Sequence, residues 1–347
     1  MYIFIDYYMI LFYNETKLME EFMNKELLEK VMELSKKDIT LEKLVKELDL
    51  SELEILGLIN ELQKQGVNIT KFASDDGIHF LNKGDITNKL DNQYTINIVD
   101  DEFKFAVISD TRLGSNAQQL SILNDIYKKA ESMGIKHILH CGNISEGIYP
   151  INNQYADSVF KNDTNMQAMY IIDNYPYIEG INTYFLCGSK DQTHLKKNKA
   201  DIGKIITSNR EDMIYLGNDR CLLNIKNSVI DMRNVKAKKT YTVSYRGQKM
   251  VDAMRSEDVP DILLYGGLLQ MESFNYRGVR LISAPSCCAS TNEMINNEHN
   301  NIVGNWFVTV KFDSKGNITS IIPISSTYYK TYKDDYLKAK TLKKGGF

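Results

Sequence analysis

The sequence predicts a small helical domain followed by a layered α/β domain with a mixed sheet. Apolar residues recur at helical spacing up to about residue 65, and further along apolar runs of strand length alternate with a helical stretch. Strands that alternate with helices and later give way to hairpins are typical of a mixed, layered α/β sheet. The length of 347 residues also favours about two domains.

The composition excludes several classes of protein. The chain has 42 Lys and Arg against 45 Asp and Glu, so its formal net charge is −3, and 43% of its residues are apolar. These values are ordinary for a globular protein and exclude a disordered, collagen-like or disulfide-stapled chain. They also exclude a uniformly basic nucleic-acid-binding protein, so any contact with DNA would come from a local patch.

The cysteines and the apolar start of the chain indicate the cellular compartment of the protein. The five cysteines are odd in number and show no C-x-x-C spacing, which is typical of buried thiols in a reducing environment. Residues 1–13 are apolar but lack a basic region and are too short to span a bilayer. We therefore expect a cytoplasmic protein with no membrane partner. Residues 1–22 form an extension of unclear role, and Met1, Met19 and Met23 stay open as its start.

Three helical segments and a hairpin are predicted over residues 23–90. The second helix begins after Thr40, and Ser51 with Glu54 forms a capping box for the third. Two alternating segments follow, separated by a hairpin turn at residues 75–77. This order of elements resembles a winged helix-turn-helix domain.

The resemblance implies that the third helix enters the major groove of DNA. The residues expected to contact DNA on this helix and the hairpin are Asn60, Gln63, Lys64, Lys71 and Lys83. Acidic residues on the same helix, Glu52, Glu54 and Glu61, oppose contact with phosphates. DNA binding and protein–protein contact both stay open for this domain.

The second domain is predicted over residues 94–326. Strands are expected at 105–109, 137–140, 182–186, 221–225, 228–232, 262–265, 279–283, 306–312 and 318–324, with a helix at 118–133. Sites in such folds usually lie in the loops at the carboxyl ends of the strands.

Four polar loops after these strands resemble the motifs of calcineurin-like metallophosphoesterases. Residues 109–114 are similar to the family's D-x-H motif, and residues 141–147 lie where the family has G-D. Residues 187–191 lie where it has G-N-H-D, and residues 265–269 where it has G-H-x-H. The resemblance implies a layered calcineurin-like phosphoesterase fold.

The family's chemistry uses two divalent cations that generate a hydroxide and hold the phosphate oxygens. Compared residue by residue, this chain lacks most of the implied ligands, although Asp110 is kept. The other positions carry Arg112 for the histidine, Asn143 for the bridging aspartate, Ser189 for the asparagine and Lys190 for the catalytic histidine. Without the bridging carboxylate, too little negative charge is left for two cations.

The last motif departs from the family pattern as well. Gly267 and Leu269 stand in place of its two histidines, and no histidine lies near Arg233 and Asn234, where the remaining ligand is expected. We therefore expect no catalytic residue, no metal and no cofactor.

Two interpretations of Arg112 and Lys190 stay open. They could form a metal-free anion site for a phosphate, nucleotide or nucleic-acid backbone, or pair with Asp110 and Asp191 and plug the pocket. The candidate pocket residues are Asp110, Arg112, Asn143, Ser189, Lys190, Asp191 and His194. Asp110 and Asp191 are the expected ligands if any metal binds, and a rebuilt site would add His194.

The C-terminal tail, residues 327–347, is rich in Lys and Tyr, which suits a phosphate backbone, with a solvated tail as the alternative. These features together predict a non-catalytic, DNA-associated protein in transcription control or replication of a phage or mobile element. The alternatives are a Mn²⁺-dependent phosphodiesterase or nuclease with a non-standard site, and a protein–protein scaffold. The oligomeric state stays open.

Overall fold

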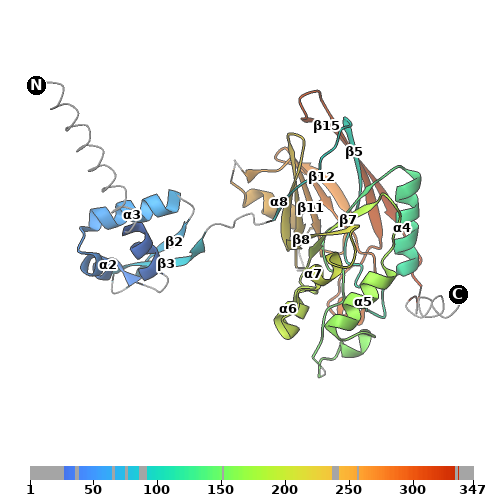
Figure 1. The fold of residues 1–347 in the computed structure, drawn as a ribbon, viewed down its shortest axis with the longest axis horizontal. Helices are drawn as coiled ribbons and strands as arrows, with labels where there is room; N and C mark the ends of the chain where they lie inside the picture. Colours follow the sequence, from blue (N-terminus) through green and yellow to red (C-terminus); the bar gives the residue numbers. More distant parts are fainter. Residues whose placement is uncertain are drawn as a thin grey trace, which may run out of the picture. The chain divides into compact units, whose positions relative to one another are not determined.

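The computed structural model divides the chain into two compact units, Met1–Asp91 and Asn92–Phe347 (Figure 1). It describes residues 27–35, 39–64, 67–74, 77–85, 92–150, 152–236, 242–255, 258–332 and 335. The predicted N-terminal extension and residues 336–347 of the tail lie outside these ranges. In the part of the chain that is described, no helix is long and apolar enough to cross a membrane.

The first unit combines helices with a small antiparallel sheet. Residues 27–34 are helical, and the helices α2 (Leu41–Leu48) and α3 (Glu52–Lys64) follow. The sheet has the order β1 (Ile39–Thr40), β3 (Gly77–Asp85), β2 (Val67–Ser74). The predicted hairpin is confirmed, because β2 and β3 pair antiparallel with Ser74 opposite Gly77.

Local capping fixes where these helices begin. The Thr40 side chain accepts a hydrogen bond from Lys43 N at the start of α2. Ser51 N donates to Glu54 Oε2 at 2.8 Å, and Glu54 N donates to Ser51 Oγ at 3.3 Å. This is the predicted capping box, which satisfies two backbone donors that a helix N-terminus leaves unpaired. The two-residue strand β1 is too short to give an alternating pattern and was not predicted.

The second unit contains two six-stranded mixed sheets. The first has the order β15 (Ile318–Thr327), β14 (Gly304–Phe312), β5 (Glu102–Ile108), β6 (His137–His140), β7 (Asn182–Cys187), β8 (Met213–Asn218). The second has the order β12 (Glu272–Tyr276), β13 (Val279–Ser283), β11 (Ile262–Gly266), β10 (Ser228–Asn234), β9 (Arg220–Ile225), β4 (Gln93–Thr95). Strands β5 to β8 pair in parallel, whereas β14 and β15 are antiparallel.

Side chains on the two faces of the first sheet belong to two apolar layers. Phe105 and Val107 of β5 pack with residues of the second sheet, such as Leu264, in a cluster between the two sheets. Ala106 and Ile108 face the other way, toward the helices of the outer layer. These are α4 (Leu120–Ser132), α5 (Thr164–Asn174) and α7 (Ile202–Thr207). The helix α8 (Tyr245–Asp252) packs through Val251 on the second sheet (Figure 1).

The predicted mixed, layered α/β architecture is confirmed, and two strand ranges, 137–140 and 279–283, match the observed bounds. The strands β4, β8 and β12 were missed. All three lie at sheet edges. β4 is exposed and β12 only partly buried, so these two lack the apolar runs that mark the central strands, whereas β8 does contain a short apolar run. Besides α4, no helix of this unit was predicted: α5, α7 and α8 were missed, as were the short helices η1 (Ala156–Ser158), α6 (Gln192–Asn198) and α9 (Asn292–Asn296).

Candidate functional site

The loops that carry the four motifs meet at the carboxyl ends of the parallel strands. Asp110 N donates to Gly142 O at 3.0 Å, and Arg112 N donates to Asn143 O at 3.1 Å, so the first two loops are joined through their backbones. Asp110, Arg112 and Asn143 have φ values of +50°, +44° and +59°. Residues other than glycine rarely adopt this left-handed backbone conformation, and strained residues of this kind are more frequent at functional sites.

The carboxylate of Asp110 is fully buried and receives four hydrogen bonds. Its Oδ1 accepts from Asn143 Nδ2 at 2.9 Å and from Arg112 Nε at 3.2 Å. Its Oδ2 accepts from Ser109 Oγ at 2.9 Å and from Gly267 N at 3.1 Å. A carboxylate has about four acceptor sites, so the protein's own donors occupy them all.

Arg112 lies between two buried carboxylates. Its Nε contacts Asp110, and its Nη1 lies 3.6 Å from Glu146 Oε1. Burial by itself would lower the pKa of Arg112, but Glu146 and Asp110 hold it above its ordinary value. Arg112 Nη1 and Glu146 Oε2 are both buried without a hydrogen-bond partner among the described residues. The guanidinium is therefore a fixed positive charge held by ionic contacts.

Lys190 is paired with Glu293. Its Nζ lies 2.5 Å from Glu293 Oε2, 3.8 Å from Glu146 Oε1 and 4.7 Å from the centre of the Tyr149 ring. The Tyr149 hydroxyl lies 2.7 Å from Glu146 Oε1 and 3.0 Å from Glu293 Oε2. Burial by itself would raise the pKa of Glu293. Lys190, and to a smaller extent Arg112, outweigh burial, so the pKa lies below its ordinary value. The predicted pairing of Lys190 with Asp191 is wrong, because α9 supplies a carboxylate that lies 103 residues away in sequence.

Asp191 and His194 join the loops through buried hydrogen bonds. Asp191 accepts hydrogen bonds from Gly188 N at 2.8 Å and from Ser145 N and Oγ at 2.8 and 2.6 Å. Burial raises the pKa of Asp191 to about 6, although these hydrogen bonds lower it. His194 is buried between Ser145 Oγ and Thr164 Oγ1, at 3.1 and 3.0 Å, and burial lowers its pKa to about 4.

The amide side chains of Asn143 and Asn234 also join the loops through hydrogen bonds. Asn143 donates to Asp110 and accepts from Lys190 N at 3.0 Å, so it joins the first three motifs through hydrogen bonds. Asn234 accepts from Ser189 N at 3.3 Å and donates to Cys141 O at 2.7 Å. Ser189 is half-buried and takes part through its backbone.

These residues do not fit the two-cation centre that the family motifs imply. Among the described residues, no group of three or more His, Cys, Asp and Glu side chains is arranged to hold a metal ion. The acceptor sites of Asp110 are used, and Arg112 places a guanidinium beside its carboxylate. Asp191 and His194 share the Ser145 hydroxyl as a hydrogen-bond partner, whereas Asp110 is bonded to other donors.

We call the five ionised side chains Asp110, Arg112, Glu146, Lys190 and Glu293 the ion-pair cluster. Three carboxylates and two cations give it a net charge of 2 − 3 = −1. A negative cluster disfavours anions, so the arrangement favours the plugged-pocket interpretation over the anion site. Glu146 lies inside the second motif loop and could have been found from the sequence. Glu293 lies outside every motif and carried no sequence signal.

The predicted DNA contacts are only partly within the described side chains. Asn60 on α3 and Lys71 on β2 are exposed. The side chains of Gln63, Lys64 and Lys83 lie outside the described residues. Leu53 at the start of α3 is 82% exposed, next to the exposed Glu52.

The beginning of the C-terminal tail is docked on α4. Tyr328 OH donates to Asp125 Oδ2 at 2.7 Å. Gln119 clasps the backbone of Tyr332, donating to its carbonyl at 2.8 Å and accepting from its N–H at 2.7 Å. Asp335 Oδ2 accepts from Ser121 N at 3.1 Å. Residues 328–332 and 335, which we call the C-terminal strap, are therefore held at α4 by hydrogen bonds, although the side chains of residues 329–332 are exposed.

All five cysteines are free and buried, as predicted. Burial raises the pKa of Cys288 to about 12, although Arg112 lowers it. A thiol with so high a pKa is protonated at neutral pH and is a poor nucleophile. The cysteines therefore act as small apolar residues in the packing.

No protein-family model matches the sequence, and no curated protein sequence is similar to it. Solved structures are similar in fold. A novel archaeal phosphodiesterase is 12% identical, with a TM-score of 0.35, over 64% of this chain and 100% of that one. Vps29 of Entamoeba histolytica in complex with zinc is 11% identical, with a TM-score of 0.34, over 65% and 99% of the two chains. The 5′-nucleotidase precursor of Thermus thermophilus is 8% identical, with a TM-score of 0.35, over 70% and 58%.

Proposed function

We propose that the protein is a non-catalytic, DNA-associated protein whose α/β unit is a degenerate calcineurin-like metallophosphoesterase domain. The observation that carries this proposal is the saturation of the Asp110 carboxylate by four protein donors. Asp110 is the one metal ligand that the motifs retain. A carboxylate whose lone pairs are all used, beside a buried guanidinium, has nothing left to offer a cation.

The first unit supports the DNA-associated part of the proposal. Its helices precede an antiparallel hairpin, the order of a winged helix-turn-helix domain. In such a domain α3 would enter the major groove and the hairpin would contact the backbone. Asn60 and Lys71 are exposed on these two elements, an amide for a base edge and an ammonium for a phosphate. Work in transcription control or in replication of a phage or mobile element would follow from this role.

Salt-dependent binding of the full chain to duplex DNA, measured by fluorescence anisotropy, tests this part. We expect affinity that falls steeply with salt, because cations on the protein release counterions from DNA. Lys71→Ala should lower the slope of log K against log salt by about one. Lys46→Ala, an exposed lysine on α2, is the matched control and should leave the slope unchanged. Absence of binding at low salt contradicts the proposal.

Exposed Leu53 favours a second candidate, a protein–protein scaffold. At 82% exposure beside Glu52, this leucine gives the start of α3 an apolar and acidic surface. Such a surface suits a protein better than a phosphate backbone. A chain that fails to bind DNA at low salt would move this candidate to first place.

The enzymatic alternative is tested with a model phosphodiester. We expect hydrolysis of bis(p-nitrophenyl) phosphate with added Mn²⁺ to stay at the rate of buffer alone. Metal-dependent turnover that Asp110→Ala abolishes would show that the protein donors around Asp110 give way to a cation, and the non-catalytic proposal would be wrong.

A further inference from the structure

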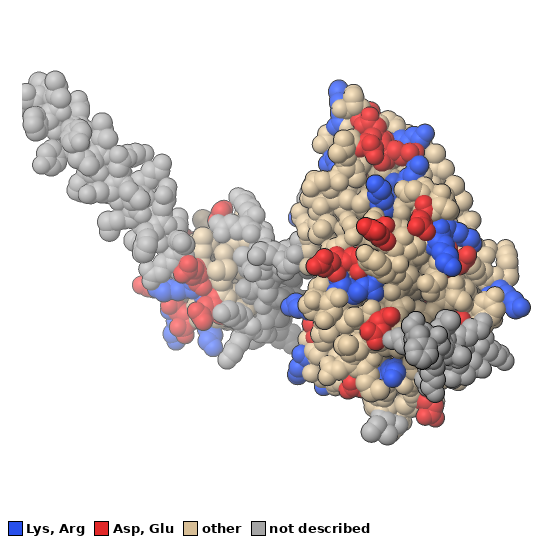
Figure 2. Space-filling model, turned by 45° about the vertical axis from the view of Figure 1, so that its right-hand side comes forward, with Lys and Arg blue, Asp and Glu red and all other residues tan. Residues whose placement is uncertain are grey.

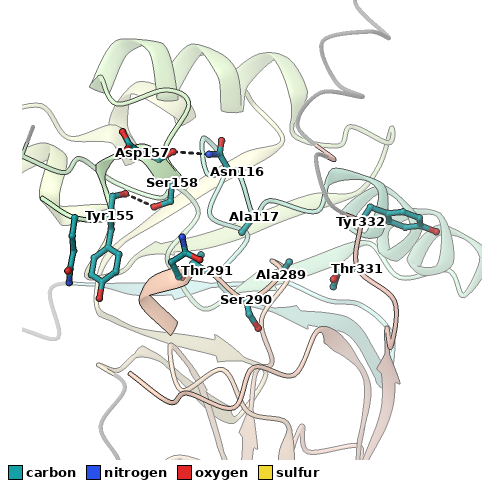
Figure 3. Close-up of a pocket in the computed structure, with 12 residues that line it drawn as sticks. Asn116, Ala117, Tyr155, Asp157, Ser158, Ala289, Ser290, Thr291, Thr331 and Tyr332 are labelled. Carbon is teal, nitrogen blue, oxygen red and sulfur yellow. Dashed lines mark hydrogen bonds between the residues drawn. The ribbon is translucent and has the colours of Figure 1, made fainter. Parts of the chain in front are cut away.

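The second unit contains a polar pocket beside the ion-pair cluster, which we call the strap pocket. Its volume is about 410 Å³, and four segments line it: residues 116–117, 154–158, 289–292 and 331–332 (Figure 3). This volume lies in the range of small-molecule sites, about 300–1,000 Å³. We propose that the strap pocket binds a neutral polyhydroxylated molecule, a sugar or a ribonucleoside, and that the C-terminal strap is part of the site.

The charge of the lining selects against anions. Among the described residues that line the pocket, none is a Lys or an Arg, and the one charged side chain is the exposed carboxylate of Asp157. A phosphate or nucleotide would meet this carboxylate with no cation to balance it. This pocket is therefore chemically distinct from a phosphodiester site.

Unused hydrogen-bonding groups point to hydroxyls. Within the described part of the chain, the side chains of Gln154, Asp157, Asn292 and Thr331 make no hydrogen bond to another residue, although all four line the pocket. They combine amide, hydroxyl and carboxylate groups. A ligand with hydroxyls can both donate and accept, and a carboxylate can accept from two hydroxyls of a diol at once. The Tyr155 ring, on one side of the pocket in Figure 3, offers a flat face to a sugar or a base.

The pocket walls are held by their own hydrogen bonds. Asn116 Nδ2 donates to Asp157 O at 2.9 Å, and Asn116 N donates to Ser158 O at 2.8 Å, which fixes two lining segments to each other (Figure 3). Thr291 caps α9 by accepting from Met294 N at 3.2 Å. A site that is already arranged before binding loses less conformational entropy when the ligand enters.

The strap completes this site from a distant part of the sequence. Thr331 and Tyr332 form one wall, and the clasp between Gln119 and Tyr332 holds that wall in place. A ligand that contacts the docked strap binds the docked state better, so it must also stabilise docking. Ligand binding and strap docking are therefore coupled.

Ligand titrations of the full chain test the proposal, followed by saturation-transfer NMR and calorimetry. The neutral probes are maltose, D-glucose, adenosine and D-ribose, and adenosine 5′-monophosphate is the anionic counterpart. We expect at least one neutral probe to bind with a Kd below about 1 mM, and the monophosphate to bind more weakly than adenosine. Binding by the sugars alone identifies a carbohydrate site, and binding by the nucleoside alone identifies a nucleoside site.

Two variants localise the binding. Asp157 is exposed, so its replacement should not disturb folding. Asp157→Asn should weaken ligand binding at least about tenfold, because one charge-assisted contact is lost. Gln119→Ala should weaken it by releasing the strap, and ligand should slow amide exchange of residues 328–332 in the parent chain. Asp100→Asn, an exposed carboxylate outside the pocket, is the matched control. No binding by any neutral probe, or binding that Asp157→Asn leaves unchanged, overturns the proposal.

Discussion

Arg112 connects the chemistry of the loops to the stability of the fold. Its guanidinium is the nearest cation to the buried carboxylate of Asp110 and one of two near that of Glu146. Removing one partner of a buried ionic contact leaves an uncompensated charge, whereas replacing both is often tolerated. The loss of Arg112 is therefore expected to affect folding.

Arg112→Met should lower the free energy of unfolding by about 3 kcal/mol at neutral pH, because the buried carboxylate of Asp110 loses its cation and that of Glu146 loses one of two. The double variant Arg112→Met with Glu146→Gln should recover part of this loss. Urea unfolding measures both values. Arg255→Met, at an exposed pair with Asp258, is the control and should cost less than about 1 kcal/mol. Equal losses for the two arginines would mean that the Arg112 contacts do not stabilise the fold.

His194 predicts how stability depends on pH. Its pKa is lowered to about 4 by burial, from an ordinary value of 6.5. The unfolded chain therefore binds more protons than the folded chain between pH 6.5 and 4, and stability falls as pH falls through this window. Since each pKa unit corresponds to about 1.4 kcal/mol, His194 accounts for up to about 3 kcal/mol by pH 4.

Comparison of the parent chain with His194→Gln isolates this contribution. Glutamine can still reach Ser145 and Thr164 but does not titrate, so the variant should lose less stability between pH 6.5 and 4. Asp191 acts in the opposite direction, because burial raises its pKa to about 6, and the difference between the two proteins removes its effect. Parallel curves of unfolding free energy against pH would contradict the assignment.

At the scale of elements, α4 receives its cap from the far end of the chain. Its N-cap residue Gln119 makes no side-chain capping bond, and its side chain clasps Tyr332 instead. The carboxylate of Asp335, buried and 214 residues away, accepts from Ser121 N in the first turn. An anion at this position also interacts favourably with the helix dipole.

Asp335→Ala should lower the free energy of unfolding by about 1 kcal/mol, the usual cost of a lost helix cap. Asp335→Asn keeps an acceptor oxygen and should recover most of the loss. Urea titration with far-ultraviolet circular dichroism gives both values. An alanine variant with the stability of the parent chain would mean that the strap does not cap α4 in solution.

At the scale of the whole molecule, each unit has its own apolar core. Leu44, Ile55 and Phe80 belong to the core of the first unit, and the cores between and outside the two sheets are formed within the second. A core of this kind can support folding by itself. On the face of the protein shown in Figure 2, acidic and basic side chains are interspersed.

Residues 92–347 expressed alone should therefore fold cooperatively and unfold at the same urea midpoint as the second unit of the full chain. Near-ultraviolet circular dichroism reports on this unit through Trp306, the chain's one tryptophan. A fragment that lacks near-ultraviolet signal, or unfolds at a much lower midpoint, would show that the second unit depends on the first.

The local elements and the layered α/β class could be predicted from the sequence. Capping at Thr40 and Ser51, alternating apolar runs and the placement of polar loops after strands depend on neighbours a few residues apart, so they can be predicted. The order of the polar loops also predicted that Asp110, Arg112 and Lys190 lie close together.

The contacts of those residues could not be predicted, because they depend on the three-dimensional fold. Lys190 meets Glu293, and α4 meets Asp335, across separations of 103 and more than 200 residues. Parallel strands bring the motif loops to one edge of the sheet, and this can be predicted. The positions of α9 and the strap cannot, because the segments that lead to them have no hydrophobic periodicity. Pairing in a buried site depends on which charges the fold places within a few ångströms, because the interaction between charges falls with distance in space and not along the chain.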